Sequence, residues 1–189
     1  MFNVKVVEDL LSSNEIKDLV DFASSIEQWE EGGGEFWSNR SLNAVNVYQN
    51  HSKEIGKLLY DIRTRIHDAI VREYSLTEEV YPDLTQIVRW FPGQEQPPHA
   101  DDMTDSKDTE WFHHRHFGAI IYLNDNYRGG HTFYPQHNFE VIPKPGMLAL
   151  HPGDTEHYHG VTKVEDSIRY TIASFWTLDK EYYDNWLIY

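Results

Sequence analysis

The sequence predicts a mainly β protein, a sandwich or jelly roll with helices on its N-terminal side. From residue 84 onward, short aromatic and β-branched runs alternate with turn pairs of Pro and Gly, a spacing typical of many short strands. Before that point, apolar residues recur at helical spacing in two segments. Aromatic residues make up 14% of the chain, which suits a β-rich core and a lined pocket.

The length of 189 residues is sufficient for one domain with a single core. We expect residues 1–189 to form that domain, with 1–83 as mainly helical support and 84–178 as the jelly-roll core. The chain has no Cys, so disulfides and thiolate metal sites are excluded. No apolar run reaches the length of a membrane span, and the first residues lack the apolar segment of a signal peptide. We therefore expect a cytoplasmic protein without a membrane partner.

The formal net charge of −15 argues against a nucleic-acid partner. Proteins that bind nucleic acid need a basic surface that displaces counterions from phosphate groups. The charge is compatible with a neutral or basic peptide as substrate, and equally with a solvated acidic surface.

The first expected elements are a short strand over residues 2–7 and a helix over 13–27. Ser12 and Glu15 have the spacing of a capping box, in which each residue satisfies a backbone N–H of the other. The apolar residues that follow at helical spacing are Ile16, Leu19, Val20, Ala23 and Ile26. Residues 32–34, three consecutive glycines, are expected to form a flexible turn after this helix.

Residues 43–48 are expected to form a strand, and a second helix is expected from about Ser52 to Tyr74. One apolar stripe runs along this helix and predicts a face that packs against a sheet. Gly56 is expected to be a weak point, because glycine is a poor helix former.

Seven strands are expected in the second half of the chain: 85–91, 117–123, 131–134, 139–142, 147–151, 157–161 and 168–177. Residues 102–114 are polar and acidic without periodicity. This segment is expected either to be solvated surface or to close over the site as a substrate lid.

The candidate site is centred on QIVRWFPGQEQPPHAD (Gln86 to Asp101), which ends in His99-Ala100-Asp101. On an extended strand, side chains two positions apart point to the same side. An imidazole and a carboxylate are two of the three ligands in a 2-His-1-carboxylate site, which binds Fe(II) and leaves coordination positions open. His159 is the candidate third ligand, and Arg169 follows it by ten positions, so the pattern reads H-x-D…H-x9-R.

Nine of the eleven histidines lie between positions 99 and 159. Most of them are expected to face solvent or to support the site without binding metal. These are His113, His114, His116, His131 and His137. His157 is the rival of His159 as third ligand if both lie on one strand, whereas His151 is expected to be a strand residue.

Arg169 lies within IRYTIASFW, an otherwise apolar strand. A buried guanidinium without a partner is costly, and a carboxylate of a cosubstrate would satisfy it through two parallel hydrogen bonds. Thr171 lies on the same face of the strand as Arg169, and its hydroxyl would add a hydrogen bond to the cosubstrate.

With these residues in place, the chain resembles the Fe(II)/2-oxoglutarate-dependent dioxygenases of the prolyl 4-hydroxylase type. The resemblance covers residues 85–178. QIVRWFPGQEQPPHAD is similar to the family's H-x-D strand, and Arg115 followed by AIIYLND and GGHTFYP is similar to its R…YL…GG-x-T-x-FP segment. HGVTKVEDSIRYTIASFW resembles its closing strand. The implied fold is a double-stranded β-helix, a cupin-like jelly roll.

The resemblance implies three Fe(II) ligands, which are also the catalytic centre: His99, Asp101 and His159. It implies that Arg169 pairs the far carboxylate of 2-oxoglutarate and that Tyr122 donates a hydrogen bond to it.

Three further residues follow from the resemblance. Trp90 stands where the family usually has a Tyr in the cosubstrate site, so an expected hydroxyl contact is either lost or replaced by an indole N–H. Arg115 and Trp176 match residues that line the substrate side.

The implied cofactors are Fe(II), 2-oxoglutarate and O2, with ascorbate in support. The implied reaction is hydroxylation, at C4, of a proline in a peptide or protein, with release of succinate and CO2. Asp101 favours hydroxylation, because related halogenases have a small residue at that position.

Other functions are open at this stage. The same chemistry could act on a free amino acid or another side chain. A nucleic-acid demethylase is disfavoured by the charge and by Ala173, close to where those enzymes carry a second Arg. A cupin-like binding module without turnover and a zinc hydrolase are alternatives from other classes.

Overall fold

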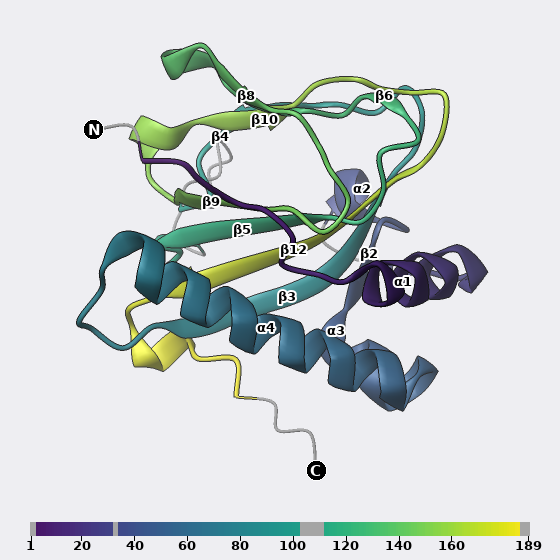
Figure 1. The fold of residues 1–189 in the computed structure, drawn as a ribbon, viewed down its shortest axis with the longest axis horizontal. Helices are drawn as coiled ribbons and strands as arrows, with labels where there is room; N and C mark the ends of the chain where they lie inside the picture. The colour runs from purple at the N-terminus through teal and green to yellow at the C-terminus, as the bar shows by residue number, and fades with distance from the viewer. Residues whose placement is uncertain (1–2, 32–33, 103–111, 186–189) are drawn as a thin grey trace.

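The computed structural model describes residues 3–31, 34–102 and 112–185, and they form two facing β-sheets with helices on one side (Figure 1). The larger sheet has the order β1 (Lys5–Val7), β9 (Leu148–Pro152), β5 (Phe117–Tyr122), β12 (Arg169–Thr177), β3 (Tyr81–Trp90) and β2 (Ser41–Asn43). The smaller sheet has the order β4 (Gln96–His99), β10 (His159–Val161), β7 (Thr132–Tyr134) and β8 (Phe139–Val141). A short ribbon pairs β6 (Arg128–Gly129) with β11 (Val164–Glu165).

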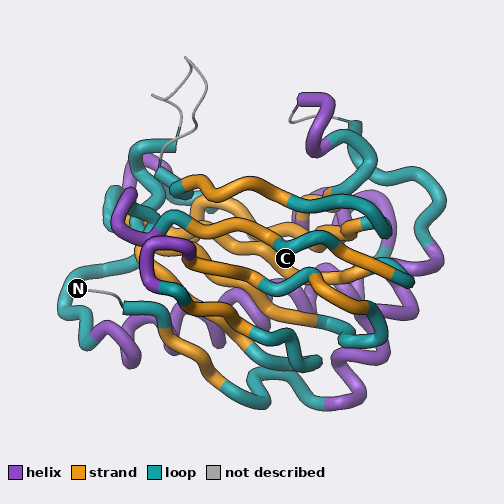
Figure 2. Tube along the Cα trace, turned by 90° about the horizontal axis from the view of Figure 1, so that it is seen from above, coloured by secondary structure: helices purple, strands orange, loops and turns teal. Residues whose placement is uncertain are grey.

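Two helices, α1 (Ser13–Ser25) and α4 (Lys53–Tyr74), cover the face of the larger sheet that points away from the smaller one (Figures 1 and 2). Their apolar stripes form the main core together with alternate residues of β3, β5, β9 and β12. The remaining helical elements are short: α2 (Gly34–Trp37), α3 (Ala44–Asn46), the π-helical turn Val47–His51, and the 3-10 turns Pro135–His137, Thr155–His157 and Lys180–Tyr182. No helix in the described part of the chain is long and apolar enough to cross a membrane.

Strand β12 shows how the larger sheet serves two purposes. Tyr170 and Ile172 belong to the core under the helices. Arg169 and Thr171 line a cavity between the two sheets. Because side chains alternate along a strand, the same nine residues contribute both to stability and to the candidate site.

The helical expectations are confirmed where local signals are strong. The side chain of Ser12 accepts a hydrogen bond from Glu15 N, and Glu15 accepts one from Ser12 N, which completes the capping box of α1. Ser52 caps α4 by accepting from Ile55 N. Glu15 also pairs with Arg65 of α4, so the cap fixes α1 against α4.

The strand expected over 43–48 is wrong except for its first residue. Asn43 ends β2 and its side chain accepts a hydrogen bond from Val45 N (2.8 Å), which starts a helical turn instead. A capping side chain therefore outweighs the β-branched residues that follow. Gly34 begins α2 and is not in a turn, while residues 32–33 lie outside the described part.

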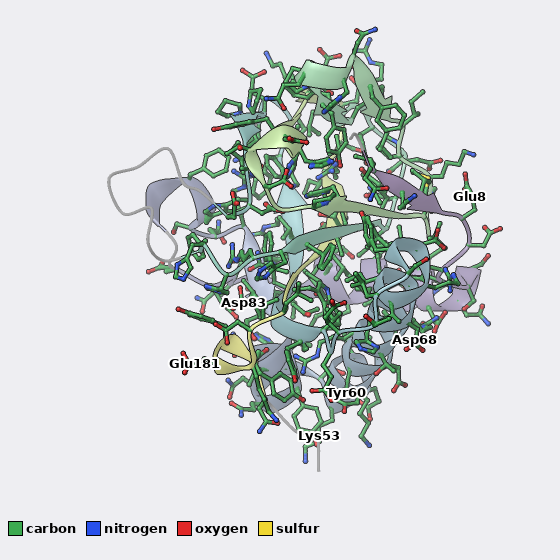
Figure 3. The ribbon with its side chains drawn as sticks, turned by 90° about the vertical axis from the view of Figure 1, so that its left-hand side faces the viewer. Glu8, Lys53, Tyr60, Asp68, Asp83 and Glu181 are labelled. Carbon is green, nitrogen blue, oxygen red and sulfur yellow. The ribbon has the colours of Figure 1, made fainter. Side chains whose placement is uncertain are left out.

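The expected division at residue 84 is not sharp. Strands β1 and β2 form the two edges of the larger sheet, and β3 begins at Tyr81. The N-terminal part of the chain thus supplies strands as well as helices. The surface carries acidic side chains such as Glu8, Asp68 and Glu181, which extend outward in Figure 3.

Gly56 is a point of close contact and not merely a weak point in α4. A Cβ at this position would lie 2.5 Å from Tyr48 Cβ and 2.6 Å from Tyr48 Cα. The glycine therefore lets the π-helical turn that contains Tyr48 pack directly on α4.

We predict that Gly56→Ala destabilises the protein although alanine is the better helix former. The helix preference of Ala is worth about 1 kcal/mol, whereas forced overlap in a packed contact costs about 1–3 kcal/mol. Urea unfolding measures the difference, with Thr64→Ala on the exposed side of α4 as control. A higher free energy of unfolding for Gly56→Ala would contradict the contact.

Candidate metal centre

The pairing of β4 with β10 brings three potential metal ligands together. His99 and His159 are direct cross-strand partners, and their ring centroids are 4.6 Å apart. Asp101 follows β4, and its Oδ1 lies 3.8 Å from His99 Nε2 and 3.7 Å from His159 Nε2. One ligand atom from each residue lies within 4.8 Å of the others, so the group can hold a metal ion. Among the described residues, it is the only such group found.

Backbone carbonyls orient both imidazoles. His99 Nδ1 lies 3.2 Å from the Pro97 carbonyl, and His159 Nδ1 lies 3.1 Å from the His157 carbonyl. When each Nδ1–H donates to its carbonyl, each Nε2 presents a lone pair to the centre of the group. The Gln96 amide also contacts His99 Nε2 (3.3 Å), and a metal would replace this contact.

The charge states of the group suit a metal. Burial raises the pKa of Asp101, but His159, the hydrogen bond from His151 and His99 outweigh it, so the pKa lies below its usual value. Burial lowers the pKa of His159 well below its usual value, and His151 adds to this effect. At neutral pH Asp101 is therefore a carboxylate and His159 a neutral imidazole, the forms that bind metals.

Arg169 lies in the same cavity and is 1% exposed. Its Nε and Nη2 have no hydrogen-bond partner among the described residues. A buried guanidinium in this state needs an anion, and a carboxylate fits its fork of donors. Thr171 and Trp90, both expected here, also line the cavity, with the Trp90 ring 5.5 Å from Arg169.

Two tyrosines lie close to this guanidinium. Tyr122 has its ring 5.4 Å from Arg169 and its hydroxyl 2.7 Å from Thr132 Oγ1. Tyr127, which sequence reasoning missed, has a buried hydroxyl that finds no partner of hydrogen-bond geometry among the described residues, and burial raises its pKa to about 12. A Cβ at Gly130 would lie 2.8 Å from both Arg169 and Tyr127, so this glycine, with φ +63°, leaves them room. In the sequence, only the pair Gly129-Gly130 before β7 pointed to this close approach of Tyr127 and Arg169.

Arg40 is a second buried cation that sequence reasoning missed. Its guanidinium lies 3.9 Å from the Trp90 ring and also packs on Phe36 and Trp37. Burial and the nearby Arg169 lower the pKa of Arg40 to about 10. Among the described residues no carboxylate pairs with it, and its nearest polar contacts are backbone carbonyls.

The expected place of Arg115 on the substrate side stays a prediction, because Arg115 is not among the described residues that line the cavity. Its Nε donates to Asp83 (2.8 Å), and its guanidinium lies 3.9 Å from the ring of Phe175, which lines the cavity. Asp83 therefore holds Arg115 against the aromatic wall.

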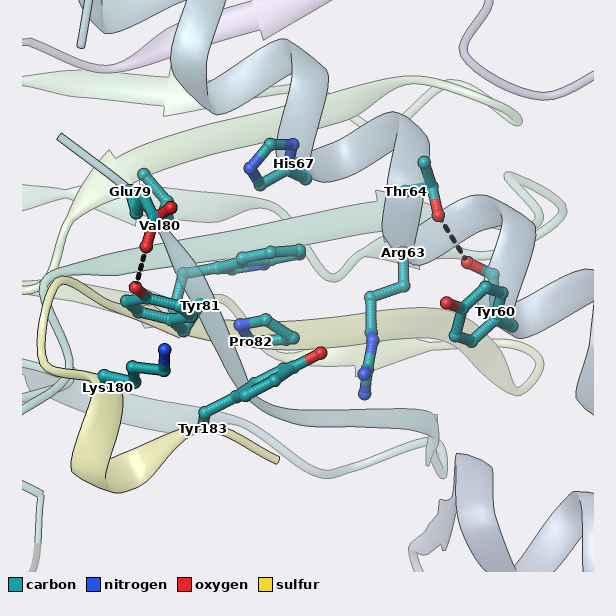
Figure 4. Close-up of a pocket in the computed structure, with 11 residues that line it drawn as sticks. Tyr60, Arg63, Thr64, His67, Glu79, Val80, Tyr81, Pro82, Lys180 and Tyr183 are labelled. Carbon is teal, nitrogen blue, oxygen red and sulfur yellow. Dashed lines mark hydrogen bonds between the residues drawn. The ribbon is translucent and has the colours of Figure 1, made fainter. Parts of the chain in front are cut away.

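The expectation that Trp176 lines the substrate side is wrong. Its side chain is on the opposite face of the larger sheet, with its ring 6.0 Å from that of His67 on α4. It lines a separate cavity of about 550 Å³ between α4 and the C-terminal segment, which Figure 4 shows with Arg63, Tyr81 and Tyr183. Phe175, one residue earlier, has the position that faces the metal group.

The remaining histidines of this region lie outside the metal group. His157 lies in a 3-10 turn, where it contacts Asp154 (2.6 Å) and Asn3 N (3.2 Å), so it is not a rival ligand. His114 is buried against Tyr182, with parallel rings 3.8 Å apart. The other four in the group expected to be peripheral lie outside the metal group. Most of the proposed lid, residues 103–111, lies outside the described residues.

His151 is the more informative case. It is a strand residue of β9, as expected, but its Nε2 also lies 2.9 Å from Asp101 Oδ2. Nothing in the local sequence signals this contact, because the two residues are 50 positions apart.

Comparison with known proteins agrees with this geometry. Residues 85–177 match the model of the 2OG-Fe(II) oxygenase superfamily. Human prolyl 3-hydroxylase 2 is 26% identical over 147 residues, which cover 67% of this chain and 21% of that protein. Mouse procollagen-lysine,2-oxoglutarate 5-dioxygenase 1 is 33% identical over 115 residues, which cover 53% of this chain and 14% of that protein. The chain thus spans about a fifth or less of the length of these two relatives.

A solved structure shares the fold. The viral collagen prolyl hydroxylase of Paramecium bursaria Chlorella virus-1, crystallised with 2-oxoglutarate, superposes with a TM-score of 0.69 at 15% identity. The alignment covers 94% of this chain and 97% of the viral one. The double-stranded β-helix expected from the sequence is confirmed.

We predict that the protein binds one Co(II) or Fe(II) ion and that Asp101→Ala weakens binding about a hundredfold or more, because the only anionic ligand is lost. The visible absorption of Co(II) during titration measures the affinity. His131→Ala is the matched control, since His131 pairs with Glu140 away from the group. Equal affinities for the wild type and Asp101→Ala would rule out this metal centre.

Proposed function

The chain belongs, through residues 85–177, to the 2OG-Fe(II) oxygenase superfamily, and from this premise we propose that it hydroxylates prolyl residues of a peptide or protein. One observation carries the proposal: a buried guanidinium with free donors, Arg169, shares a cavity with the only candidate metal group of the described residues. The metal group and the guanidinium are the two attachments that 2-oxoglutarate needs.

In this proposal the iron ligands are His99, Asp101 and His159. When bound, Fe(II) with 2-oxoglutarate and O2 supplies the oxidation that turns a C–H bond into C–OH, with release of succinate and CO2. The chain fixes the three ligands, holds the cosubstrate and keeps water out of the cavity.

The far carboxylate of 2-oxoglutarate would pair with Nε and Nη2 of Arg169. The Tyr122 ring lies 5.4 Å from Arg169, and Tyr127 and Arg169 both border Gly130. The hydroxyls of these two tyrosines would add donors to the same carboxylate, and Thr171 lines the same wall. A charged pair with a planar fork is stronger than a neutral hydrogen bond, so Arg169 should dominate the affinity.

The cavity wall favours proline over lysine as the reacting residue. Most of its lining is apolar or aromatic: Trp37, Val88, Trp90, Ala119, Ile120, Val161, Ala173 and Phe175. Asp101 is the only acidic residue among the described lining residues, and it belongs to the metal group. A lysyl ammonium would lose water without gaining a partner, whereas a pyrrolidine ring would bury apolar surface.

Two finer points stay predictions. The first is hydroxylation at C4 of the proline ring. One relative is named a prolyl 3-hydroxylase, so the comparisons do not favour C4 over C3. The cytoplasmic location is the other.

We predict that Fe(II) and 2-oxoglutarate, added without oxygen, give a visible absorption band that Arg169→Ala weakens by raising the dissociation constant of 2-oxoglutarate at least tenfold. The loss of a buried charged hydrogen bond gives this magnitude. Arg128→Ala is the control, because Arg128 is an exposed arginine that pairs with Glu165 and Asp166. No band in the folded wild type would overturn the 2-oxoglutarate assignment and leave a metal-binding module.

We predict that prolyl peptides gain about 16 Da, one oxygen atom, in the presence of Fe(II), 2-oxoglutarate and O2. Succinate formation should match the oxygen gained. Peptides with lysine in place of the target proline are the matched comparison, and mass spectrometry with amino-acid analysis separates the ring positions. Oxidation of the lysyl peptides alone would overturn the proline preference and keep the reaction class.

A further inference from the structure

Behind the metal group, three buried side chains form a hydrogen-bonded series. Tyr134 OH lies 2.9 Å from His151 Nδ1, and His151 Nε2 lies 2.9 Å from Asp101 Oδ2. Tyr134 and His151 are at most 1% exposed, and Asp101 is 7% exposed. We infer that His151 and Tyr134 are positioning residues that hold Asp101 as a one-oxygen metal ligand, an inference that rests on the metal site proposed above.

The two oxygens of the Asp101 carboxylate have different partners. Oδ1 points to the metal group, 3.8 Å from His99 Nε2 and 3.7 Å from His159 Nε2. Oδ2 points the other way, to His151. A carboxylate that turned both oxygens toward the ion would occupy an additional coordination position. The hydrogen bond from His151 keeps Oδ2 away, so this position stays open for ligands other than the protein.

With a neutral imidazole at His151, the donors and acceptors of the series fit in one order. The Asp101 carboxylate only accepts, so His151 Nε2–H donates to it. His151 Nδ1 then accepts from the hydroxyl of Tyr134, which donates. His151 is thereby fixed as the Nε2–H tautomer, and its ring orientation is set from β7 through Tyr134.

Gly118 of β5 makes room for this contact. A Cβ at Gly118 would overlap both Asp101 Oδ2 and His151 Nε2. No side chain larger than hydrogen fits without separating the two groups. The contact between Asp101 and His151 therefore depends on a glycine of β5. The carboxylate is held by His151 from the larger sheet, while the imidazoles of His99 and His159 come from the smaller one.

A buried polar series of this kind has a cost. Each group loses water on burial, and an apolar residue of similar size would pack in the position of His151 without that loss. A role in packing alone would thus be met as well by leucine, which gives the inference a direct test.

The test compares His151→Gln, His151→Leu and Tyr134→Phe in the full chain without metal. Gln carries a donor and an acceptor about as far apart as those of His, so it can keep both hydrogen bonds; Leu keeps only the volume. Co(II) titrations give the dissociation constant and the visible spectrum, which reports the coordination of the ion. Thermal unfolding of the metal-free variants checks that each one is folded.

We expect His151→Leu to weaken Co(II) binding about 10- to 100-fold and to change the spectrum. His151→Gln should stay within about threefold of the wild type, and Tyr134→Phe should fall between, because it frees the ring of His151 but keeps its donor. Gly118→Ala should resemble His151→Leu, since the added methyl group separates the same two side chains.

A second readout does not depend on metal. Long-range ¹H–¹⁵N NMR of the metal-free protein should show His151 as the Nε2–H tautomer. The Nδ1–H tautomer would overturn the inference, because it cannot donate to Asp101 through Nε2. This measurement, together with Tyr134→Phe, keeps the test decisive if His151→Leu does not fold.

The outcomes separate the inference from the proposed function. If the wild type binds no Co(II), the metal site itself is wrong. If the wild type binds and a folded His151→Leu matches it in affinity and spectrum, the metal site stands and the positioning role of His151 is overturned.

Discussion

The pairing of β4 with β10 is the constraint on which the candidate site depends. It places His99 directly opposite His159, although the two are 60 positions apart in the chain. A slip of one residue in this register would turn one imidazole to the other face of the sheet and remove it from the group. Asp101 adds a second constraint, because His151 of the larger sheet holds its outer oxygen. The three candidate ligands are in place only when the two sheets face each other correctly.

Two buried arginines near Trp90, which lines the cavity, are the second feature of the site. Arg169 lies on one side of Trp90 and Arg40 packs on the same indole, and no carboxylate of the described residues pairs with either one. Their mutual repulsion contributes to the lowered pKa of Arg40. An anion in the cavity would relieve this repulsion and satisfy the free donors of Arg169 at once. The indole of Trp90, where relatives of the expected type usually have a tyrosine, suits this arrangement because its face can pack against a guanidinium.

The sequence was sufficient where the determining contacts are local or follow a fixed period. The cap of α4 at Ser52 and the H-x-D pattern are of this kind, because their partners are a few residues away. His151 could not be assigned a role, since its contact with Asp101 joins strands of different sheets. The expectation for Trp176 was wrong for a different reason. The period of two, counted from Arg169 along β12, already places it on the helix-facing side, and only the resemblance to relatives suggested otherwise.

The acidic surface and the cationic cavity act on different molecules and over different distances. With a formal net charge of −15, the protein repels a dianion such as 2-oxoglutarate at long range, but salt screens this repulsion beyond about 8 Å. Binding must then come from short-range pairing inside the cavity, where Arg169 is shielded from water and each hydrogen bond to a charged group is strong. The same surface charge attracts basic molecules at long range. The burial of Arg169 is therefore what allows an acidic protein to bind an acidic cosubstrate.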